Sequence, residues 1–318
     1  MASTREIKRR ITSIKNVGQV TKALQMVAST KMRRAQDRAS HSRPYSEQLV
    51  KLLARLASQA AGEENLPLMA VRPVHRAAIV MIAPDRGFAG GLPGNLNRRT
   101  AELALDLRRQ HGADTELRFI AVGRKGRDWV VRSGQQLEAE FTNLGDQPSL
   151  SDVRAIARAV SDIYIEERVD QVHLVYSRFV STSTQVATAV QLLPIQPPAD
   201  LAEEGPEPQY EFEPDAATIF AELLPRYLET QIYQPMLESI ASYYSAQMIA
   251  MKNATDNAVE LVGDLTLVYN KARQAAITTQ ILEVVAGAVN NGPDNFGPSG
   301  PLYAREQCKE LGAPFPER

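Results

Sequence analysis

A glycine-rich stretch is the part of the sequence with the clearest capacity for chemistry. Residues 84–95 (PDRGFAGGLPGN) lie between an apolar segment expected to form a buried strand and a segment expected to form a helix. An open α/β sheet binds phosphates at this position, where loop N–H groups and a helix N-terminus face the anion. The glycine spacing matches neither the dinucleotide fingerprint nor the P-loop, and no Lys-Ser or Lys-Thr pair follows. A tight turn that packs strand against helix is the favoured interpretation.

Other residue types that carry chemistry are scattered. Cys308 has no second cysteine and no histidine near it in the sequence, so it is a poor candidate nucleophile. Asp85 and Asp256 have no evident catalytic partner. The histidines lack the paired spacing of metal ligands; they are His41, His75, His111 and His173. We therefore expect no catalytic residue, no metal and no cofactor, and a function that depends on shape and contacts.

Composition places the chain among ordinary globular proteins. Its 318 residues suggest about two domains, and its 44% hydrophobic and 23% charged content is typical of that class. The net charge of −1 gives no general attraction to nucleic acid or membranes. Apolar runs such as 77–83 are too short to span a bilayer, and the start, MASTREIKRR, has no apolar core of a secretory signal. A single cysteine fits a reducing compartment, so we expect a cytoplasmic protein.

The elements that must position any site are dominated by one long helix at 236–286. This stretch has no proline and one internal glycine, Gly263. At 1.5 Å per residue it would form a rod of roughly 75 Å, too long for its own domain to cover. Its heptad seam, counted from Met236, carries apolar residues at both ends but polar ones such as Asn257 and Asp264 in the middle. We interpret this seam as built for close approach, with modest stability from its own pairing.

Residues 3–60 read as a second long helix, capped by Ser3 or Thr4. One apolar stripe runs from Ile7 to Ala35 at heptad spacing. A second stripe lies on another face, at Val17, Val20, Leu24 and Val27. Because one stripe suffices to pack on the C-terminal helix, the other calls for a further partner. Pro44 is expected to kink or break this helix, and GEENLP at 62–67 to end it.

The first helix is also strongly basic. Within residues 5–43, only Glu6 and Asp37 oppose eleven basic residues, which are Arg5, Lys8, Arg9, Arg10, Lys15, Lys22, Lys31, Arg33, Arg34, Arg38 and Arg43. A solvated helix face is the ordinary interpretation, and an acidic protein partner is the functional one. Nucleic acid is disfavoured, because no aromatic residue is interleaved before Tyr45 and the charges lie all round the helix.

The middle of the chain predicts an α/β fold. Strands are expected at 77–83, 117–123, 136–141, 171–179 and 184–194, and helices through about Arg109, at 125–132 and at 149–168 with Ser151 as cap. Alternating strands and helices imply a mostly parallel sheet, and the last two strands a hairpin at its edge. An acidic, proline-rich loop at 195–214 and a short helix to Leu224 follow, after which Pro225 can start the long helix and Pro235 bend it. Beyond Gly287 we expect a flexible tail.

Both ends of the sequence resemble one family. The run MIAMKNATDNAVELVGDLTLVYNKARQAAITTQILEVVAGA (248–288) is similar to the signature of the gamma subunit of F-type ATP synthases. REIKRRITSIKNVGQVTKALQMVASTKMRRAQ (5–36) resembles the start of that subunit, and APDRGFAGGLPGNL (83–96) its central domain. The resemblance implies a long antiparallel coiled coil (3–60 with 215–288), a central open, Rossmann-like α/β domain (75–194) and a C-terminal extension (289–318).

The resemblance also implies a function without catalysis. In this family the subunit is the rotor of the central stalk, coupling proton-driven rotation of the c-subunit ring to ATP synthesis in a hexamer of alpha and beta subunits, with epsilon as a further partner. The complex lies on the cytoplasmic side of the bacterial plasma membrane. Arg273 and Gln274 match the contact with a catch loop of a beta subunit. Tyr210 and Glu213 match, less specifically, a region that contacts the c ring.

The basic helix fits the same family role. Arg9, Lys15, Lys22, Lys31 and Arg33 are expected to meet acidic loops of the beta subunits. The regulatory insertion of photosynthetic gamma subunits is absent near 194–213, and a single cysteine makes thiol switching unexpected. Two alternatives remain open from the sequence: a nucleotide-binding α/β protein with a coiled-coil arm, using the loop at 84–95, and a nucleic-acid scaffold using residues 5–43.

Overall fold

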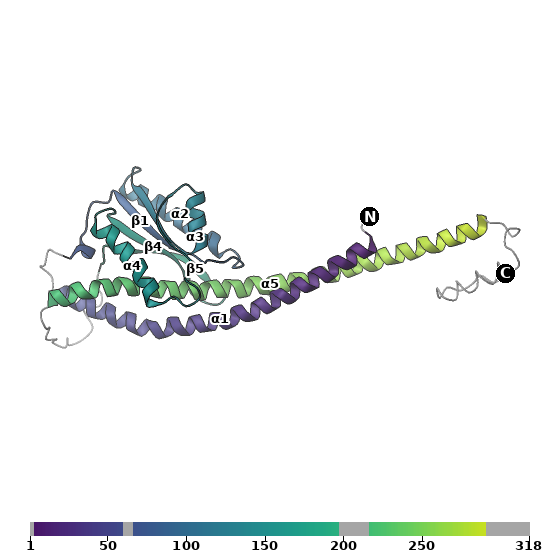
Figure 1. Ribbon diagram of the computed structural model, residues 1–318, viewed down its shortest axis with the longest axis horizontal. Helices are drawn as coiled ribbons and strands as arrows, with labels where there is room; N and C mark the ends of the chain where they lie inside the picture. The colour runs from purple at the N-terminus through teal and green to yellow at the C-terminus, as the bar shows by residue number, and fades with distance from the viewer. Residues whose placement is uncertain (1–2, 60–65, 197–215, 291–318) are drawn as a thin grey trace. The chain divides into compact units, whose positions relative to one another are not determined.

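The computed structural model describes residues 3–59, 66–196 and 216–290 (Figure 1). Two long helices, α1 (Thr4–Gln59) and α5 (Ala216–Asn290), come before and after an α/β sheet in the sequence. The expected fold class is confirmed. The chain divides into two compact units, each considered on its own. Residues 20–255 form the sheet unit, and the described residues of 1–19 and 256–318 form the arm unit.

The sheet unit is built on five strands in the order β3-β2-β1-β4-β5. Their bounds are β1 Arg76–Ile82, β2 Glu116–Val122, β3 Gln136–Phe141, β4 Gln171–Phe179 and β5 Gln185–Leu193. The first four strands run parallel, with β1 between β2 and β4, and the apolar run of β1 is buried because helices cover both faces of the sheet. The expected hairpin at the edge is confirmed, because β5 pairs antiparallel with β4.

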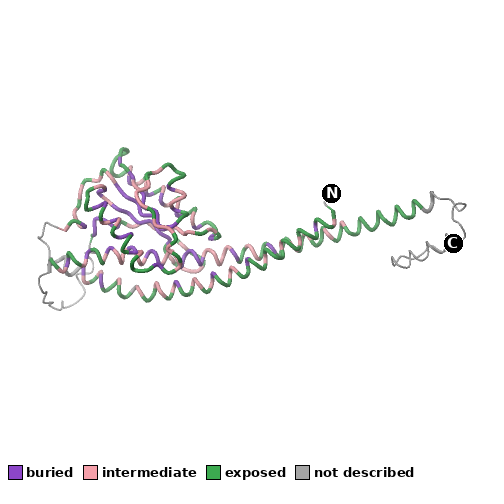
Figure 2. The backbone as a smooth tube through the Cα atoms, viewed as in Figure 1, coloured by how far each residue is buried: buried purple, intermediate pink, exposed green. Residues whose placement is uncertain are grey.

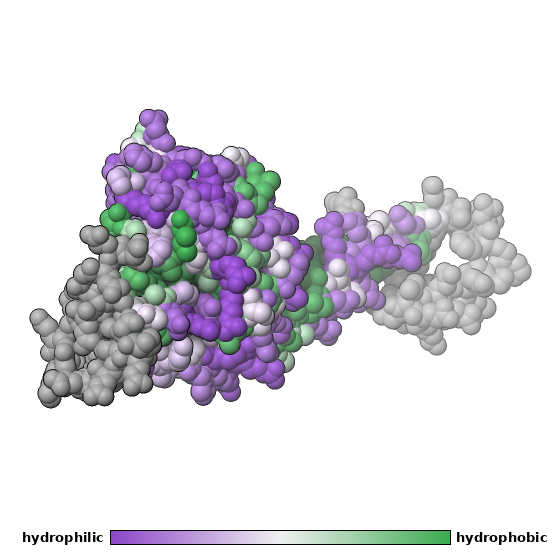
Figure 3. Space-filling model, turned by 60° about the vertical axis from the view of Figure 1, so that its left-hand side comes forward, coloured by the Kyte–Doolittle hydropathy of each residue, from purple (hydrophilic) through white to green (hydrophobic). Residues whose placement is uncertain are grey.

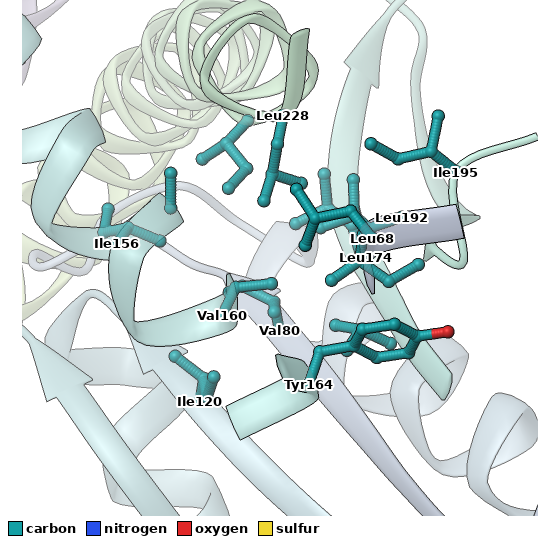
Figure 4. Close-up of a cluster of buried hydrophobic side chains, with 14 of the residues drawn as sticks. Leu68, Val80, Ile120, Ile156, Val160, Tyr164, Leu174, Leu192, Ile195 and Leu228 are labelled. Atoms are coloured by element: carbon teal, nitrogen blue, oxygen red, sulfur yellow. The ribbon is translucent and has the colours of Figure 1, made fainter. Parts of the chain in front are cut away.

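Helices cover both faces of the sheet. On one face, α4 (Leu150–Ile165) packs Ile156 and Val160 towards Val80 and Leu174, and Leu228 of α5 joins the same cluster (Figure 4). On the other face, α2 (Leu92–His111) and α3 (Arg124–Arg132) contribute a second buried cluster; its members include Leu96, Leu107, Phe119 and Val130. The short 3-10 helix η1 (Pro67–Met69) buries Leu68 in the first cluster.

The cap of α4 corrects one expectation. Ser149, not Ser151, is the N-cap: its hydroxyl accepts from the Asp152 N–H at 3.2 Å, and the Asp152 carboxylate accepts from the Ser149 N–H at 2.8 Å. This reciprocal capping box satisfies two N–H groups that the first turn leaves without helical partners. Ser151 has no acidic residue three positions later, which is the sequence signal that distinguishes the two serines.

The long helices continue through their prolines: α1 does not break at Pro44, and the expected start of the long helix at Pro225 is wrong. Helix α1 continues through Pro44, and α5 begins at Ala216 and continues through Pro225 and Pro235. An internal proline removes one backbone donor at a cost of about 3 kcal/mol. Apolar packing offsets this cost on α5, where Leu224 and Met236 lie beside the prolines and are 2% and 3% exposed. At the other end α5 continues past Gly287 to Asn290.

In both units α1 and α5 run antiparallel, as their contacts show. In the sheet unit, the hydroxyls of Thr21 and Thr255 lie 2.8 Å apart, and Ser42 donates to Gln234 at 2.5 Å. In the arm unit, a Cβ on Gly18 would lie 3.4 Å from the Cβ of Ala258. Gly18 therefore permits close contact with the smallest apolar side chain, which explains a glycine inside this helix despite its low helix propensity.

The seam of α5 follows the expected heptad only to Ala254. Beyond it, Asn257 and Asp264 are exposed, and the side facing α1 is formed by Ala258, Val262, Leu265, Tyr269 and Ala272. A strict seven-residue repeat lags a helix of 3.6 residues per turn by about 20° per heptad, so at Asn257, three heptads after Met236, it has slipped by about 60°, more than half the roughly 100° between successive residues. The predicted seam positions Asn257 and Asp264 are therefore wrong, and beyond Thr255 the pairing face is made of small and apolar residues.

The free energy of unfolding is expected to fall on acidification because of His173. This imidazole is buried on β4, and burial, together with the charge of His111, lowers its pKa from 6.5 to about 4. Below pH 6.5 His173 binds a proton in the unfolded chain but not in the folded chain. Stability that is present above pH 6.5 is therefore lost as the pH falls towards 4. Between pH 7 and 4.5 we expect this group to remove about 2 kcal/mol.

The measurement is urea unfolding of the free chain followed by fluorescence of its one tryptophan, Trp129, which lies in α3 and packs edge-on against Phe119. A His173→Leu variant is the control, because Nε2 of His173 has no hydrogen-bond partner to lose. The variant should show a flatter pH dependence over this range. Equal slopes for the two chains would contradict the assignment.

Candidate functional site

The glycine loop at 84–95 contacts α5. The Tyr243 hydroxyl donates to the carbonyl of Gly87 at 3.2 Å, and a Cβ on Gly90 would lie 3.9 Å from the Cβ of Ala250. Phe88 and Gly90 adopt positive φ, at 64° and 56°, which turns the chain tightly between β1 and α2. A phosphate approaching this part of the loop would meet α5. The structure thus favours the tight-turn interpretation over a nucleotide site.

Asp85 joins three loops at the C-terminal edge of the sheet. Its carboxylate accepts from the N–H of Arg124 at 2.9 Å and from that of Asn143 at 3.1 Å. A cavity of about 190 Å³ lies here, walled partly by Met236 and Tyr243 of α5. Because both oxygens of Asp85 are engaged by backbone donors, this carboxylate holds loops together and is not poised for acid–base chemistry.

Neither a metal site nor a membrane span is found in the described residues. They contain no group of three or more His, Cys, Asp or Glu side chains placed to hold a metal ion. None of the described helices combines the length and the hydropathy that a membrane-spanning segment needs. The candidate functional features that the described residues do contain are exposed surfaces.

A continuous uncovered surface lies on the arm unit. Every residue of α5 from Arg273 to Gly287 is exposed (Figure 2). Large apolar side chains are among the exposed residues of the arm unit, at Val17, Val259, Leu261, Leu267, Val268, Ile277, Ile281, Leu282, Val284 and Val285. Nine of these ten lie on α5, and apolar groups gathered in this way on one element mark a surface for a protein partner. The sequence-predicted pair Arg273 and Gln274 lies at the start of this fully exposed stretch.

The second stripe of α1 is also uncovered. In the sheet unit Val20 is 58% and Val27 51% exposed, although Leu24 is half-buried. The face drawn in Figure 3 is largely hydrophilic, with separate hydrophobic patches reaching the surface. The stripe therefore has the exposure that an external partner would require, as its sequence pattern predicts.

The predicted basic contacts divide into two groups. Arg9, Lys15, Lys22 and Arg33 are exposed, and none of them forms an ion pair within the described chain. Lys31 is different, because its ammonium donates to the carboxylate of Asp146 and, at 3.3 Å, to the hydroxyl of Tyr244. Its charge is engaged inside the sheet unit while its side chain stays 35% exposed, and its expected contact with an acidic partner stays a prediction. Tyr210 and Glu213 lie outside the described residues.

Sequence reasoning missed the residues with which α5 is bonded to the sheet. These are Ser242, Tyr243, Tyr244 and Ser245, with Asp146 and Lys31 as partners of Tyr244. The available signal was a run of four polar-tipped side chains, SYYS, inside a helix whose neighbours are apolar. Four successive side chains on a helix point in four directions. If all four are buried, the helix must be surrounded by structure at that level.

A helical pair with a broad uncovered surface, joined to an α/β sheet, defines a protein that works through contacts with partners. A family model described as ATP synthase matches residues 3–289. The ATP synthase gamma chain of Dehalococcoides mccartyi strain CBDB1 is 46% identical over 289 residues, covering 91% of this chain and 99% of the relative. That of Roseiflexus sp. strain RS-1 is also 46% identical, covering 91% and 98%. The chain belongs to the ATP synthase gamma chain family.

Solved structures share the fold. The rotor of the Euglena gracilis mitochondrial ATP synthase aligns with a TM-score of 0.61 at 18% identity, covering 86% of this chain and 98% of that chain. The central stalk and c-ring structure from Tetrahymena thermophila mitochondrial ATP synthase aligns at 0.56 and 22% identity, covering 74% and 99%. At these identities the likeness concerns the arrangement of helices and sheet.

Proposed function

We propose that this chain is the central-stalk rotor subunit of an F-type ATP synthase, which couples rotation of a proton-driven c-subunit ring to ATP synthesis in an alpha/beta hexamer. The observation that carries the proposal is the exposure of α5 from Arg273 to Gly287 in a chain of this family. A helix with exposed Ile277, Ile281 and Leu282 needs cover, and the cavity of a hexamer supplies it on all sides. The subunit is non-catalytic, and the hexamer performs the chemistry.

Arg273 and Gln274 are the proposed contact with a beta subunit. Both are exposed on α5, and the guanidinium of Arg273 has no ion pair within the described chain. A planar guanidinium can make several directed hydrogen bonds to one loop, which break and reform as the neighbouring loop changes. Arg9, Lys15, Lys22 and Arg33 are proposed to meet acidic loops of the same subunits.

The sheet unit is proposed to face epsilon and the c ring, with Tyr210 and Glu213 as c-ring contacts. The subunit would thus reach the membrane only through the complex, on the cytoplasmic side of the bacterial plasma membrane. This arrangement agrees with the hydropathy of the described helices, none of which resembles a membrane span.

Affinity purification of the tagged chain from its native membranes tests the assignment. The expected result is recovery of alpha, beta, epsilon and c subunits in one complex with ATPase activity. A chain truncated after Thr255 keeps the sheet unit and lacks the α5 part of the arm unit, so it should lose the hexamer. Recovery of the full-length chain as a free monomer, with these subunits purifying elsewhere, would refute the proposal.

A further inference from the structure

Four consecutive residues of α5 each bind a different segment at the C-terminal edge of the sheet. The Ser242 hydroxyl donates to the carbonyl of Ser177 in β4 at 2.9 Å. Tyr243 donates to Gly87 in the glycine loop at 3.2 Å. Tyr244 donates to the carboxylate of Asp146 in the loop before α4. Ser245 donates to Thr182, in the turn between β4 and β5, at 2.6 Å. We call residues 242–245 the collar.

The collar bonds are distributed around the helix. Successive residues of an α-helix are turned by about 100°, so four in a row spread over about 300° of its circumference. The helix is therefore held from most directions at one level of its axis. Burial is nearly complete at this level: Ser242 and Ser245 are 0% exposed, Tyr244 4% and Tyr243 9%.

Neighbouring groups strengthen the hydrogen bond that Tyr244 contributes to the collar. Lys31 of α1 donates to the same Asp146 carboxylate, and Arg38 donates to the Asp146 carbonyl at 3.2 Å. Burial of the Asp146 carboxyl raises its pKa, but the hydrogen bonds from Lys31 and Tyr244 and the charges of Lys31 and Arg86 outweigh burial and lower it. The carboxylate is thus charged at neutral pH. Asp146 consequently joins both long helices to one loop of the sheet unit.

The collar hydrogen bonds oppose rotation of α5 about its own axis, which apolar packing does not. On the N-terminal side of the collar, α5 is held by buried apolar residues, among them Phe220, Leu228 and Ile232. Apolar burial is non-directional, so a small rotation of the helix about its axis exchanges one apolar contact for another. Hydrogen bonds weaken steeply as the donor angle departs from linear, so four bonds at four angles oppose rotation in either sense.

We infer that the collar is a rotational lock, in which Ser242, Tyr243, Tyr244 and Ser245 are positioning residues that prevent α5 from turning about its own axis against the sheet. The inference rests on the proposed rotor function, since a lock of this kind matters where torque passes between the sheet and the helix. The alternative is a purely structural role, in which the four hydroxyls add stability without affecting stiffness.

The test removes the hydroxyls and keeps the side-chain packing. The collar variant carries Ser242→Ala, Tyr243→Phe, Tyr244→Phe and Ser245→Ala. The matched control carries Tyr227→Phe and Tyr269→Phe on the same helix, for which no side-chain hydrogen bond is found in the described structure. In both, Cys308→Ser and Arg109→Cys place one label at the exposed end of α2. Each chain is assembled into the full complex, which is immobilised through the hexamer.

The readout is the angular spread of the label while rotation is paused, together with proton pumping against an imposed gradient. Loss of the four hydrogen bonds should widen the spread by at least about twofold in the collar variant and leave the control unchanged. Pumping should fall while ATP hydrolysis without a gradient persists. An unchanged spread and unchanged pumping in the assembled collar variant would overturn the lock.

Two further outcomes keep the inference separate from the rotor assignment. If the label on the chain with an intact collar does not rotate with ATP, the proposed function fails before the collar is tested. If the fourfold variant does not assemble, Tyr243→Phe and Tyr244→Phe are measured singly by the same assay. Angular distributions equal to the control in both single variants would then overturn the lock, and a wider distribution in either would support it.

Discussion

Replacing Gly123 by alanine is expected to destabilise the sheet unit by about 4 kcal/mol or more, enough to unfold a large fraction of the free chain. Gly123 follows β2 with φ 99° and ψ 144°, a conformation that essentially only glycine adopts. An added Cβ would lie 1.9 Å from the carbonyl oxygen of Ala83. That backbone cannot yield cheaply, because Ala83 donates to Val122 at 2.8 Å and Gly123 donates to Phe141 at 2.7 Å.

Gly134→Ala is the matched control for this prediction. Gly134 also has positive φ, at 66°, but a Cβ there would meet nothing within 4 Å. Only the backbone strain remains, about 1–2 kcal/mol. Urea unfolding followed by Trp129 fluorescence compares the two variants, since Trp129 lies six residues after Gly123. Equal midpoints for the two variants would show that the close approach to Ala83 has been misjudged.

Arg273→Ala is expected to reduce coupled ATP synthesis in the assembled complex by at least about tenfold, because the proposed beta-subunit contact would bury its charged hydrogen bonds, and losing one partner of such a bond costs about 2–5 kcal/mol. The free chain should unfold as before, since Arg273 is exposed and makes no ion pair within the described structure. Arg273→Lys should recover little activity, because an ammonium lacks the planar fork of the guanidinium.

Lys271→Ala is the control for the Arg273 variants, as Lys271 is an exposed cation two residues earlier on α5. ATP synthesis in reconstituted vesicles energised by a proton gradient is the measurement, with the amount of assembled complex determined in parallel. Synthesis by Arg273→Ala equal to that of the Lys271→Ala complex would remove Arg273 from the proposed beta-subunit contact.

Local sequence patterns predicted the elements of the sheet well. Apolar runs bounded by loop residues located β1 and β4 within about two residues, the ordinary error of such boundaries. The prolines led to a wrong prediction of where the long helix begins. The cost of Pro225 and Pro235 to a helix is visible in the sequence, but the packing of Leu224 and Met236 that offsets this cost is not. Element type was therefore predictable where local and tertiary preferences agree, and continuity was not where they conflict.

The candidate site was predictable only in part. The exposure of Arg273 follows from its polar setting on a helix too long to be covered, and the structure places it there. The role of Lys31 did not follow, because Asp146 is 115 residues away in sequence and only the fold brings the two together. The seam beyond Ala254 failed for a geometric reason, the mismatch between 3.5 and 3.6 residues per turn, which accumulates along a helix this long.

ATP-driven rotation of a probe attached to the thiol of the Arg109→Cys, Cys308→Ser chain tests the central proposal most directly. Arg109 lies near the end of α2, and its side chain is 75% exposed. With the hexamer fixed to a surface, the rotor assignment predicts that the probe turns continuously in one direction when ATP is added and stops when ATP is removed. A probe that stays at one angle, on complexes that contain this chain and hydrolyse ATP, would contradict it.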